Sequence, residues 1–129
     1  MELFFYKAEV KRVVDGDTID VLIDVGFSMH YAGRVRFYGV NTPESRTSNL
    51  EEKKAGLAAK EFVEQWIASN NNIVYLKTIK DKNEKYGRIL AEIYNQDKTE
   101  CLNIELIKAG LAKEYFGVGS KTWAEFEKE

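Results

Sequence analysis

The most constraining feature of the sequence is a strict alternation of residue types between positions 19 and 25. The odd positions hold branched apolar residues, and the even positions are mostly acidic: Ile19, Val21, Ile23 and Val25 alternate with Asp20, Leu22 and Asp24. A period of two predicts a β-strand with one buried face. If the strand runs back without a bulge, Asp17 lies on that same face. A carboxylate that faces a core is costly unless it is paired or binds a metal ion, so Asp17 is a first candidate for chemistry.

Other segments predict a β-rich chain with helices. Strands are expected around Val35 and Phe37, at 73–79, at 89–94 and at 112–116. Between them, apolar residues at helical spacing over 59–67 predict a helix that begins with a capping box at Ser48 and Glu51 and ends at 70–72. A second, shorter helix is expected from Asn103, as N-cap, to Gly110. The pattern favours an α+β, β-rich fold, namely a five-stranded OB-type barrel with two to three packed helices.

Length and composition limit the kinds of protein that this chain could be. Its 129 residues fit one domain, with no repeat and no linker, so 1–129 is expected to be a single unit. The formal net charge of −2 argues against broad, nonspecific binding to nucleic acid. The single cysteine, Cys101, cannot form an internal disulfide, which favours a reducing compartment. Although Cys101 precedes a helix, where a thiol pKa can fall, it is interpreted as a small core residue.

No segment resembles an export signal or a membrane span. The first residues lack a basic region followed by a long apolar run, and no apolar stretch is long enough to cross a bilayer. We therefore expect a soluble, cytoplasmic or otherwise intracellular protein that does not associate with membranes and acts as a monomer.

The single histidine removes several catalytic classes. With only His30, a histidine-based zinc site and a two-histidine ribonuclease mechanism are excluded. No convincing Ser-His-Asp arrangement is present, and the glycines at 117 and 119 do not match a phosphate-binding P-loop.

The first motif is Asp-Gly-Asp-Thr at 15–18. It places two carboxylates beside a glycine that permits a tight turn. Calcium and magnesium prefer such hard oxygen ligands. Taken alone, the motif is equally typical of a simple turn between two strands.

The second motif is Asn-Thr-Pro-Glu at 41–44, directly after a predicted strand. Pro43 favours extended backbone at Thr42 and stiffens the loop. A rigid loop could hold the Thr42 carbonyl and the Glu44 carboxylate at fixed places. The alternative is an ordinary proline turn with a surface glutamate.

Two sets of cations could bind phosphate. Arg34 and Arg36 share one strand face, where each could bind a phosphate bidentately or lie on a solvated sheet surface. The third motif, Lys-Tyr-Gly-Arg at 85–88, combines cations, a phenol and a flexible turn. It could clamp a phosphate and stack a base, or form a cationic hairpin loop.

Taken together and in order, these motifs resemble the staphylococcal nuclease (thermonuclease) family. The resemblance covers roughly residues 8–116 and includes the three motifs and Ala-Gly-Leu-Ala at 109–112. It implies an OB-type barrel and an endonuclease that hydrolyses DNA and RNA with calcium, leaving 3′-phosphate products.

The resemblance also implies a calcium site. Asp17 matches a direct ligand, and Thr42 matches a ligand through its backbone carbonyl. Asn41 stands where the best-known members have an aspartate ligand. An amide oxygen can still coordinate calcium, but one negative charge is lost, so affinity is expected to be weaker by about ten- to a hundredfold.

The remaining roles follow from the same resemblance. Glu44 matches the carboxylate that positions or activates the attacking water, and Arg36 and Arg88 match the two arginines that bind the phosphate. The substrate-binding positions are Lys85 and Tyr86, near a terminal phosphate, and Tyr115, near a base.

Three functions remain open at this point: an active nuclease, a non-catalytic OB-fold module that binds nucleic acid, and a protein-interaction domain. The first two would have single-stranded or locally open DNA, or RNA, as partner. A pure binding module has no need for inward carboxylates beside its phosphate site, so the joint presence of acidic and arginine positions favours the nuclease.

Overall fold

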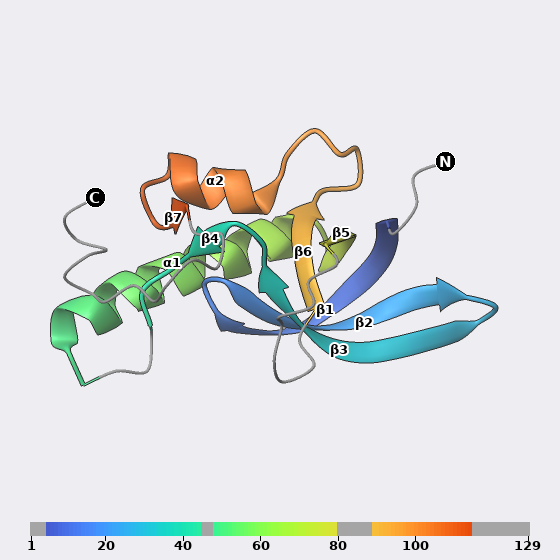
Figure 1. The fold of residues 1–129 in the computed structure, drawn as a ribbon, viewed down its shortest axis with the longest axis horizontal. Coiled ribbons are helices and arrows are strands. Elements are labelled where there is room, and N and C mark those ends of the chain that lie inside the picture. Colours follow the sequence, from blue (N-terminus) through green and yellow to red (C-terminus); the bar gives the residue numbers. More distant parts are fainter. Residues whose placement is uncertain (1–4, 45–47, 80–88, 115–129) are drawn as a thin grey trace.

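The computed structural model describes residues 5–44, 48–79 and 89–114. Within them, five strands form a closed barrel with the order β1-β2-β3-β6-β5 (Figure 1). The strands are β1 (Phe5–Asp15), β2 (Thr18–Gly26), β3 (Met29–Phe37), β5 (Ile73–Ile79) and β6 (Ile89–Tyr94). Neighbours pair antiparallel except β3 and β6, which are parallel. The predicted five-stranded, β-rich α+β fold of OB type is confirmed.

Two very short strands form a separate ladder beside the barrel. β4 (Val40–Asn41) pairs antiparallel with β7 (Lys113–Glu114). β7 falls inside the strand expected at 112–116. This ladder links the segment that follows β3 to the chain that follows the second helix.

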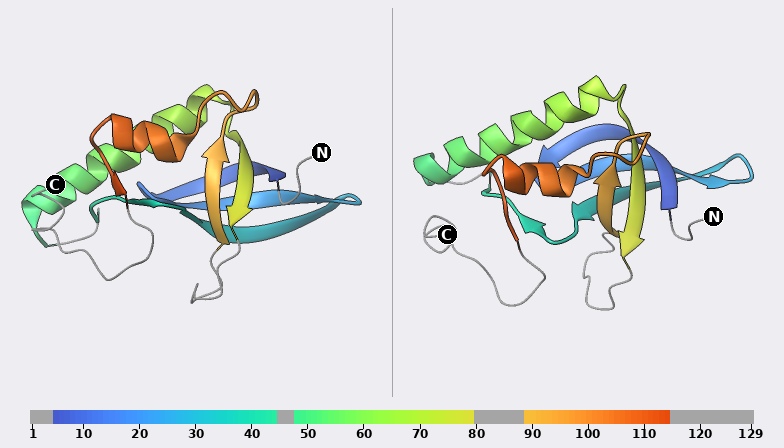
Figure 2. Two further views of the ribbon diagram at one scale, coloured as in Figure 1. Left: turned by 45° about the horizontal axis from the view of Figure 1, so that its top comes forward. Right: turned by 90° about the horizontal axis from the view of Figure 1, so that it is seen from above.

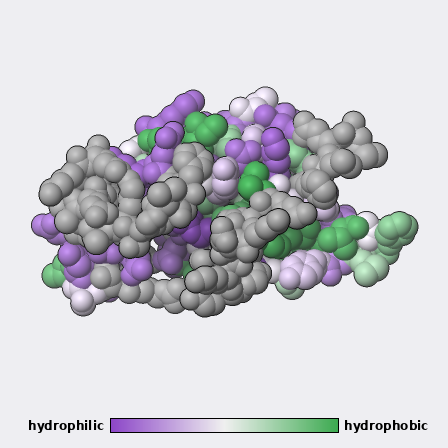
Figure 3. All heavy atoms as spheres, viewed as in Figure 1, coloured by the Kyte–Doolittle hydropathy of each residue, from purple (hydrophilic) through white to green (hydrophobic). Residues whose placement is uncertain are grey.

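The alternation in β2 produces the expected buried face, but only over part of its length. Ile19, Val21 and Ile23 are buried, whereas Val25 is 42% exposed. The β2–β3 hairpin extends past the rest of the barrel, and no other described helix or strand covers its outer end (Figure 1). Apolar side chains consequently gather at this end in the space-filling view (Figure 3), where Phe27, Met29 and Tyr31 are exposed.

The long helix α1 (Leu50–Ser69) begins one residue later than expected. Its N-cap is Asn49 rather than Ser48, because the Asn49 side chain accepts hydrogen bonds from the backbone N–H groups of Glu51 and Glu52, both at 3.1 Å. The helix ends where predicted. Asn71 and Asn72 adopt φ values of 59° and 62°, and this left-handed backbone cannot continue a helix.

One face of α1 is buried against β1, and α2 (Leu102–Lys108) packs beside it (Figure 2). The buried positions of α1 grow in size along the helix: Gly56, Ala59, Val63 and Ile67. The first half of the helix can therefore approach its neighbours closely. Within the described residues, no helix has the length and apolar character needed to cross a membrane.

Helix α2 is capped differently from the prediction. Cys101 is its N-cap residue, and Asn103, which was expected to be the cap, lies inside the helix. The Cys101 thiol is buried, as its interpretation as a core residue requires, and this burial raises its pKa rather than lowering it.

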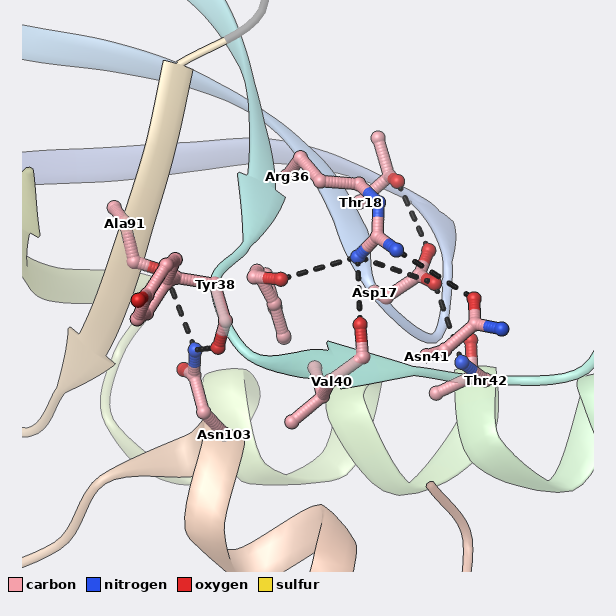
Figure 4. A network of polar contacts seen from close by, with 10 residues as sticks. Asp17, Thr18, Arg36, Tyr38, Val40, Asn41, Thr42, Ala91 and Asn103 are labelled. Carbon is pink, nitrogen blue, oxygen red and sulfur yellow. Dashed lines mark hydrogen bonds and ion pairs between the residues drawn. The ribbon is translucent and has the colours of Figure 1, made fainter. Parts of the chain in front are cut away.

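The Asn103 side chain serves tertiary structure instead. Its Oδ1 accepts a hydrogen bond from the Ile93 N–H at 3.0 Å. Its Nδ2 donates to the carbonyls of Tyr38 at 2.8 Å and Ala91 at 3.2 Å (Figure 4). One buried amide therefore joins α2 to β6 and to the turn between β3 and β4.

Most of the largest fully buried side chains come from the barrel and from α2. Burial of each apolar side chain of this size contributes about 1.5–3 kcal/mol. They include Ile19, Phe37, Leu76, Ile93, Leu102 and Leu106. The core thus lies inside the barrel and beneath the helices, and the ends of the strands remain available for polar side chains.

We expect Asn103→Ala to lower the free energy of unfolding by about 2–4 kcal/mol, because it leaves the buried Ile93 N–H and the Tyr38 carbonyl without this partner. Urea denaturation followed by circular dichroism measures the change. Ile104→Ala is the matched control, since its side chain is half-exposed on the same helix. Equal effects of the two substitutions would show that the amide network contributes nothing specific.

Candidate active site

The turn between β1 and β2 brings Asp17 to the end of the barrel. Gly16 lies in this turn and packs directly on α1: a Cβ atom added to it would lie 2.7 Å from the Ala59 Cβ and 3.0 Å from the Thr42 Oγ1. Only glycine fits such an approach. Asp17 directly precedes β2 and is only 9% exposed, so its carboxylate is buried as the sequence predicts.

Three donors surround the Asp17 carboxylate (Figure 4). The Thr18 hydroxyl donates to Oδ1 at 3.0 Å, and the Thr42 N–H donates to Oδ2 at 3.2 Å. The Arg36 Nη1 lies 3.4 Å from Oδ2. Hydrogen bonds and an opposite charge offset the cost of burying the carboxylate.

Arg36 reaches this carboxylate from the end of β3. Its Nη1 donates to the backbone carbonyls of Phe37 at 3.0 Å and Val40 at 2.9 Å, which fixes the guanidinium beside the turn before β4. Its Nη2 has a longer contact, 3.5 Å, with the Asn41 Oδ1. The side chain is only 16% exposed.

Arg34 takes a different path although it shares a strand face with Arg36. Its Nε and Nη2 donate to the two carboxylate oxygens of Asp20 at 2.8 and 3.2 Å, outside the barrel. The hydrogen bond from Arg34 holds the pKa of the Asp20 carboxyl below its usual value. Of the two phosphate-binding candidates, only Arg36 lies beside Asp17.

A small polar cavity of about 220 Å³ is lined by the candidate site residues of the first two motifs and by Arg36. Its walls come from the β1–β2 turn, the end of β3 and the loop after β4, and they comprise Asp15, Asp17, Thr18, Arg36, Asn41, Thr42, Pro43 and Glu44. Glu44 is exposed at this cavity, whereas Thr42 and Pro43 are buried. A wider surface depression between β1 and α1, about 450 Å³, contains none of the predicted site residues.

Four predicted site residues cannot be placed. Lys85, Tyr86, Arg88 and Tyr115 lie outside the described residues. Their roles in phosphate and base binding stay predictions.

The oxygen atoms that line the cavity are suitable ligands for a hard cation. They are carboxylate, amide and hydroxyl oxygens, which calcium prefers. The buried Thr42 Oγ1 has no hydrogen-bond partner among the described residues, although buried hydroxyls are normally satisfied. In the described part of the chain no three His, Cys, Asp or Glu side chains form a metal-binding group.

The structure adds residues that sequence reasoning had not assigned to the site. Asp15 lines the cavity beside Asp17, and its place in the first motif was the only signal for it. The motif marked Gly16 as a turn residue, but its close approach to α1 and the carbonyls that hold Arg36 had no signal in the sequence.

Comparisons with known proteins find one family and several relatives. Residues 34–128, nearly three quarters of the chain, match the family model described as "Staphylococcal nuclease homologue". The thermonuclease of Staphylococcus intermedius is 39% identical over 107 residues, covering 83% of this chain and 58% of that protein. The thermonuclease of Staphylococcus hyicus is 33% identical over 108 residues, covering 84% and 59%. The micrococcal nuclease of Shigella flexneri is 28% identical over 134 residues, covering 96% and 68%. The chain thus spans somewhat more than half the length of the two thermonucleases.

The two buried threonines of the site should respond to valine with opposite signs. Thr42→Val removes a hydroxyl that lacks a partner among the described residues, so we expect the metal-free protein to gain about 1 kcal/mol in free energy of unfolding. Thr18→Val removes a donor to a charged carboxylate and should cost about 1.5–3 kcal/mol. Urea denaturation in EDTA measures both, and similar losses in the two variants would contradict this assignment.

Proposed function

Because the chain belongs to the staphylococcal nuclease family, we propose that it is a calcium-dependent nuclease that hydrolyses phosphodiester bonds of DNA or RNA. The observation that carries the proposal is the meeting of Asp17, Arg36 and Glu44 at one cavity. The buried Asp17 carboxylate supplies a cation ligand, and the fixed Arg36 guanidinium supplies hydrogen-bond donors for a phosphate. The exposed Glu44 carboxylate supplies a base. A site that only binds nucleic acid needs the second of these and not the other two.

Arg36 binds the phosphate in this proposal. Its Nη1 is held by two backbone carbonyls, while among the described residues its Nη2 has only the long contact to Asn41. A phosphate oxygen can replace the Asn41 amide at Nη2 without releasing the guanidinium from its turn. Phosphoryl transfer depends mainly on such positioning and charge stabilisation.

Glu44 acts as the general base. Its exposed carboxylate accepts a proton from water at the cavity, and the water oxygen attacks phosphorus. A bond forms between that oxygen and phosphorus, and the bond to the 5′ oxygen breaks as the 5′ oxygen takes up a proton from solvent. Glu44 then releases its own proton to solvent. The products are a 3′-phosphate and a 5′-hydroxyl.

Asp17, the Asn41 side chain and the Thr42 carbonyl would hold the calcium ion. When bound, calcium polarises the phosphate and orients water. Asp17 brings the formal charge, and the other two donors are neutral. This set fits the oxygen preference of calcium but makes the site less charged than one with an aspartate at position 41.

The residues outside the described part complete the proposed machinery. Arg88 would supply a second guanidinium to the phosphate as charge develops. Lys85 and Tyr86 would bind a neighbouring phosphate, and Tyr115 would stack on a base of single-stranded or locally open substrate.

The test is cleavage of single-stranded DNA by the purified protein in millimolar-range calcium. We expect EDTA to abolish cutting and Glu44→Gln to lower the rate by about 10²- to 10⁴-fold, the usual contribution of a general base. Arg36→Lys should lose about 10²-fold because it removes the planar donor pair from the phosphate.

Two substitutions serve as matched controls. Arg34→Lys changes the neighbouring arginine on the same strand face, which pairs with Asp20 away from the cavity. Glu51→Gln removes an exposed carboxylate in the first turn of α1. Both should leave the rate essentially unchanged. No cutting at any calcium concentration, with DNA binding that persists in EDTA, would instead identify a non-catalytic OB-fold binding module.

Restoring a negative charge at position 41 should tighten calcium binding. We expect Asn41→Asp to lower the calcium dissociation constant by about ten- to a hundredfold, because it adds a charged ligand. Isothermal titration calorimetry measures the change. Asn49→Asp adds the same charge at an exposed helix cap, outside the cavity, and should have little effect. Unchanged affinity in Asn41→Asp would remove residue 41 from the calcium site.

A further inference from the structure

Helix α1 contains a single glycine, Gly56, and the loop that carries Glu44 rests on it. A Cβ atom added to Gly56 would lie 2.4 Å from the Glu44 carbonyl oxygen, 2.5 Å from the Glu44 carbonyl carbon and 2.7 Å from the Pro43 carbonyl oxygen. All three atoms belong to backbone, which cannot turn aside as a flexible side chain can. Any side chain at this position must therefore displace the loop.

Glycine is a poor choice for the interior of a helix, because it loses more backbone freedom on folding than alanine does. Gly56 lies one full turn inside α1, is buried and has no capping role. The close approach of the Pro43–Glu44 backbone gives a physical reason for a glycine here.

Ala59, the next buried residue on the same face of α1, contacts the β1–β2 turn, which forms another wall of the cavity. Ala59 lies against Gly16 in the β1–β2 turn, which leads directly into Asp17. Gly56 and Ala59 are three residues apart and so lie on one face of the helix. One rigid element thereby supports both the loop of Glu44 and the turn of Asp17.

We propose that Gly56 is a positioning residue for Glu44. The absence of a side chain lets the Pro43–Glu44 backbone rest on α1, and this contact sets where the Glu44 carboxylate lies relative to Asp17. The role in hydrolysis rests on the proposed function of Glu44, whereas the contact itself does not. Because misplacement of a catalytic group by about 1 Å can cost a hundredfold in rate, this contact should control turnover.

The kinetic test compares the wild-type protein with Gly56→Ala. We expect kcat for single-stranded DNA to fall about tenfold to a hundredfold, with KM nearly unchanged, because the methyl group moves the base and leaves Arg36 in place. Ala58→Ser is the matched control, since it adds one heavy atom at an exposed position of the same helix. It should preserve kcat.

A double-mutant cycle separates positioning of Glu44 from a general effect on the fold. If Gly56 acts through Glu44, Gly56→Ala should have no further effect on kcat once Glu44 is glutamine. Additive losses would overturn the proposal, because they would place the effect elsewhere. Failure of Gly56→Ala to fold would overturn it too, since the contact would then support the whole domain.

An NMR measurement tests the contact even if the wild-type protein shows no nuclease activity. The backbone amide signals of Thr42 and Glu44 should shift in Gly56→Ala, while those of α2 should stay in place. Unchanged signals at both residues would overturn the proposal. Shifted signals in a protein that cuts no nucleic acid would support the contact and reject the proposed function alone.

Discussion

The buried carboxylate of Asp17 is the constraint on which the cavity depends. A charge in this position requires partners, and they come from three separate places: the Thr18 hydroxyl in β2, the Arg36 guanidinium at the end of β3 and the Thr42 N–H after β4. Thr18 follows Asp17 directly, but Arg36 and Thr42 lie outside Asp17's own turn. The barrel, the β3–β4 turn and the loop after β4 must therefore reach their final arrangement together, because an unpaired buried charge would cost several kcal/mol.

Much of the fold could be predicted because its elements have strong local periodicity. The strands at 73–79 and 89–94 begin and end as predicted, and the helix stops at the asparagines that follow it. The first residue of each helix was harder to predict. Ser48 and Asn49 are both good caps, and only the geometry decides which side chain reaches the free N–H groups. Asn103 has the composition of a cap but binds distant backbone groups, which no local pattern reveals.

The candidate site, too, could be predicted from the sequence only in part. The sequence indicated polar residues at strand ends and turns, and the structure brings Asp17, Arg36 and Glu44 to one cavity, although their roles stay predictions. The sequence alone could not show which of Arg34 and Arg36 belongs to the site, because both lie on the same strand face. The difference arises from what lies opposite each one, namely Asp20 for the first and backbone carbonyls for the second. The close approach of Gly16 to α1, and of the Pro43–Glu44 backbone to Gly56, is equally hidden, since each joins segments distant in the chain.

The parallel pairing of β3 with β6 has a consequence for the order of events during synthesis. Residues 35–37 of β3 meet residues 89–91 of β6, so barrel closure must wait for a long intervening segment and oppose its loop entropy. The β1–β2 and β2–β3 hairpins, in contrast, are local and can form early. Among the described residues, all those that line the cavity precede position 45. A chain emerging from the ribosome therefore carries these side chains long before it has the frame that holds them, and the cavity takes its final shape only once β6 has docked.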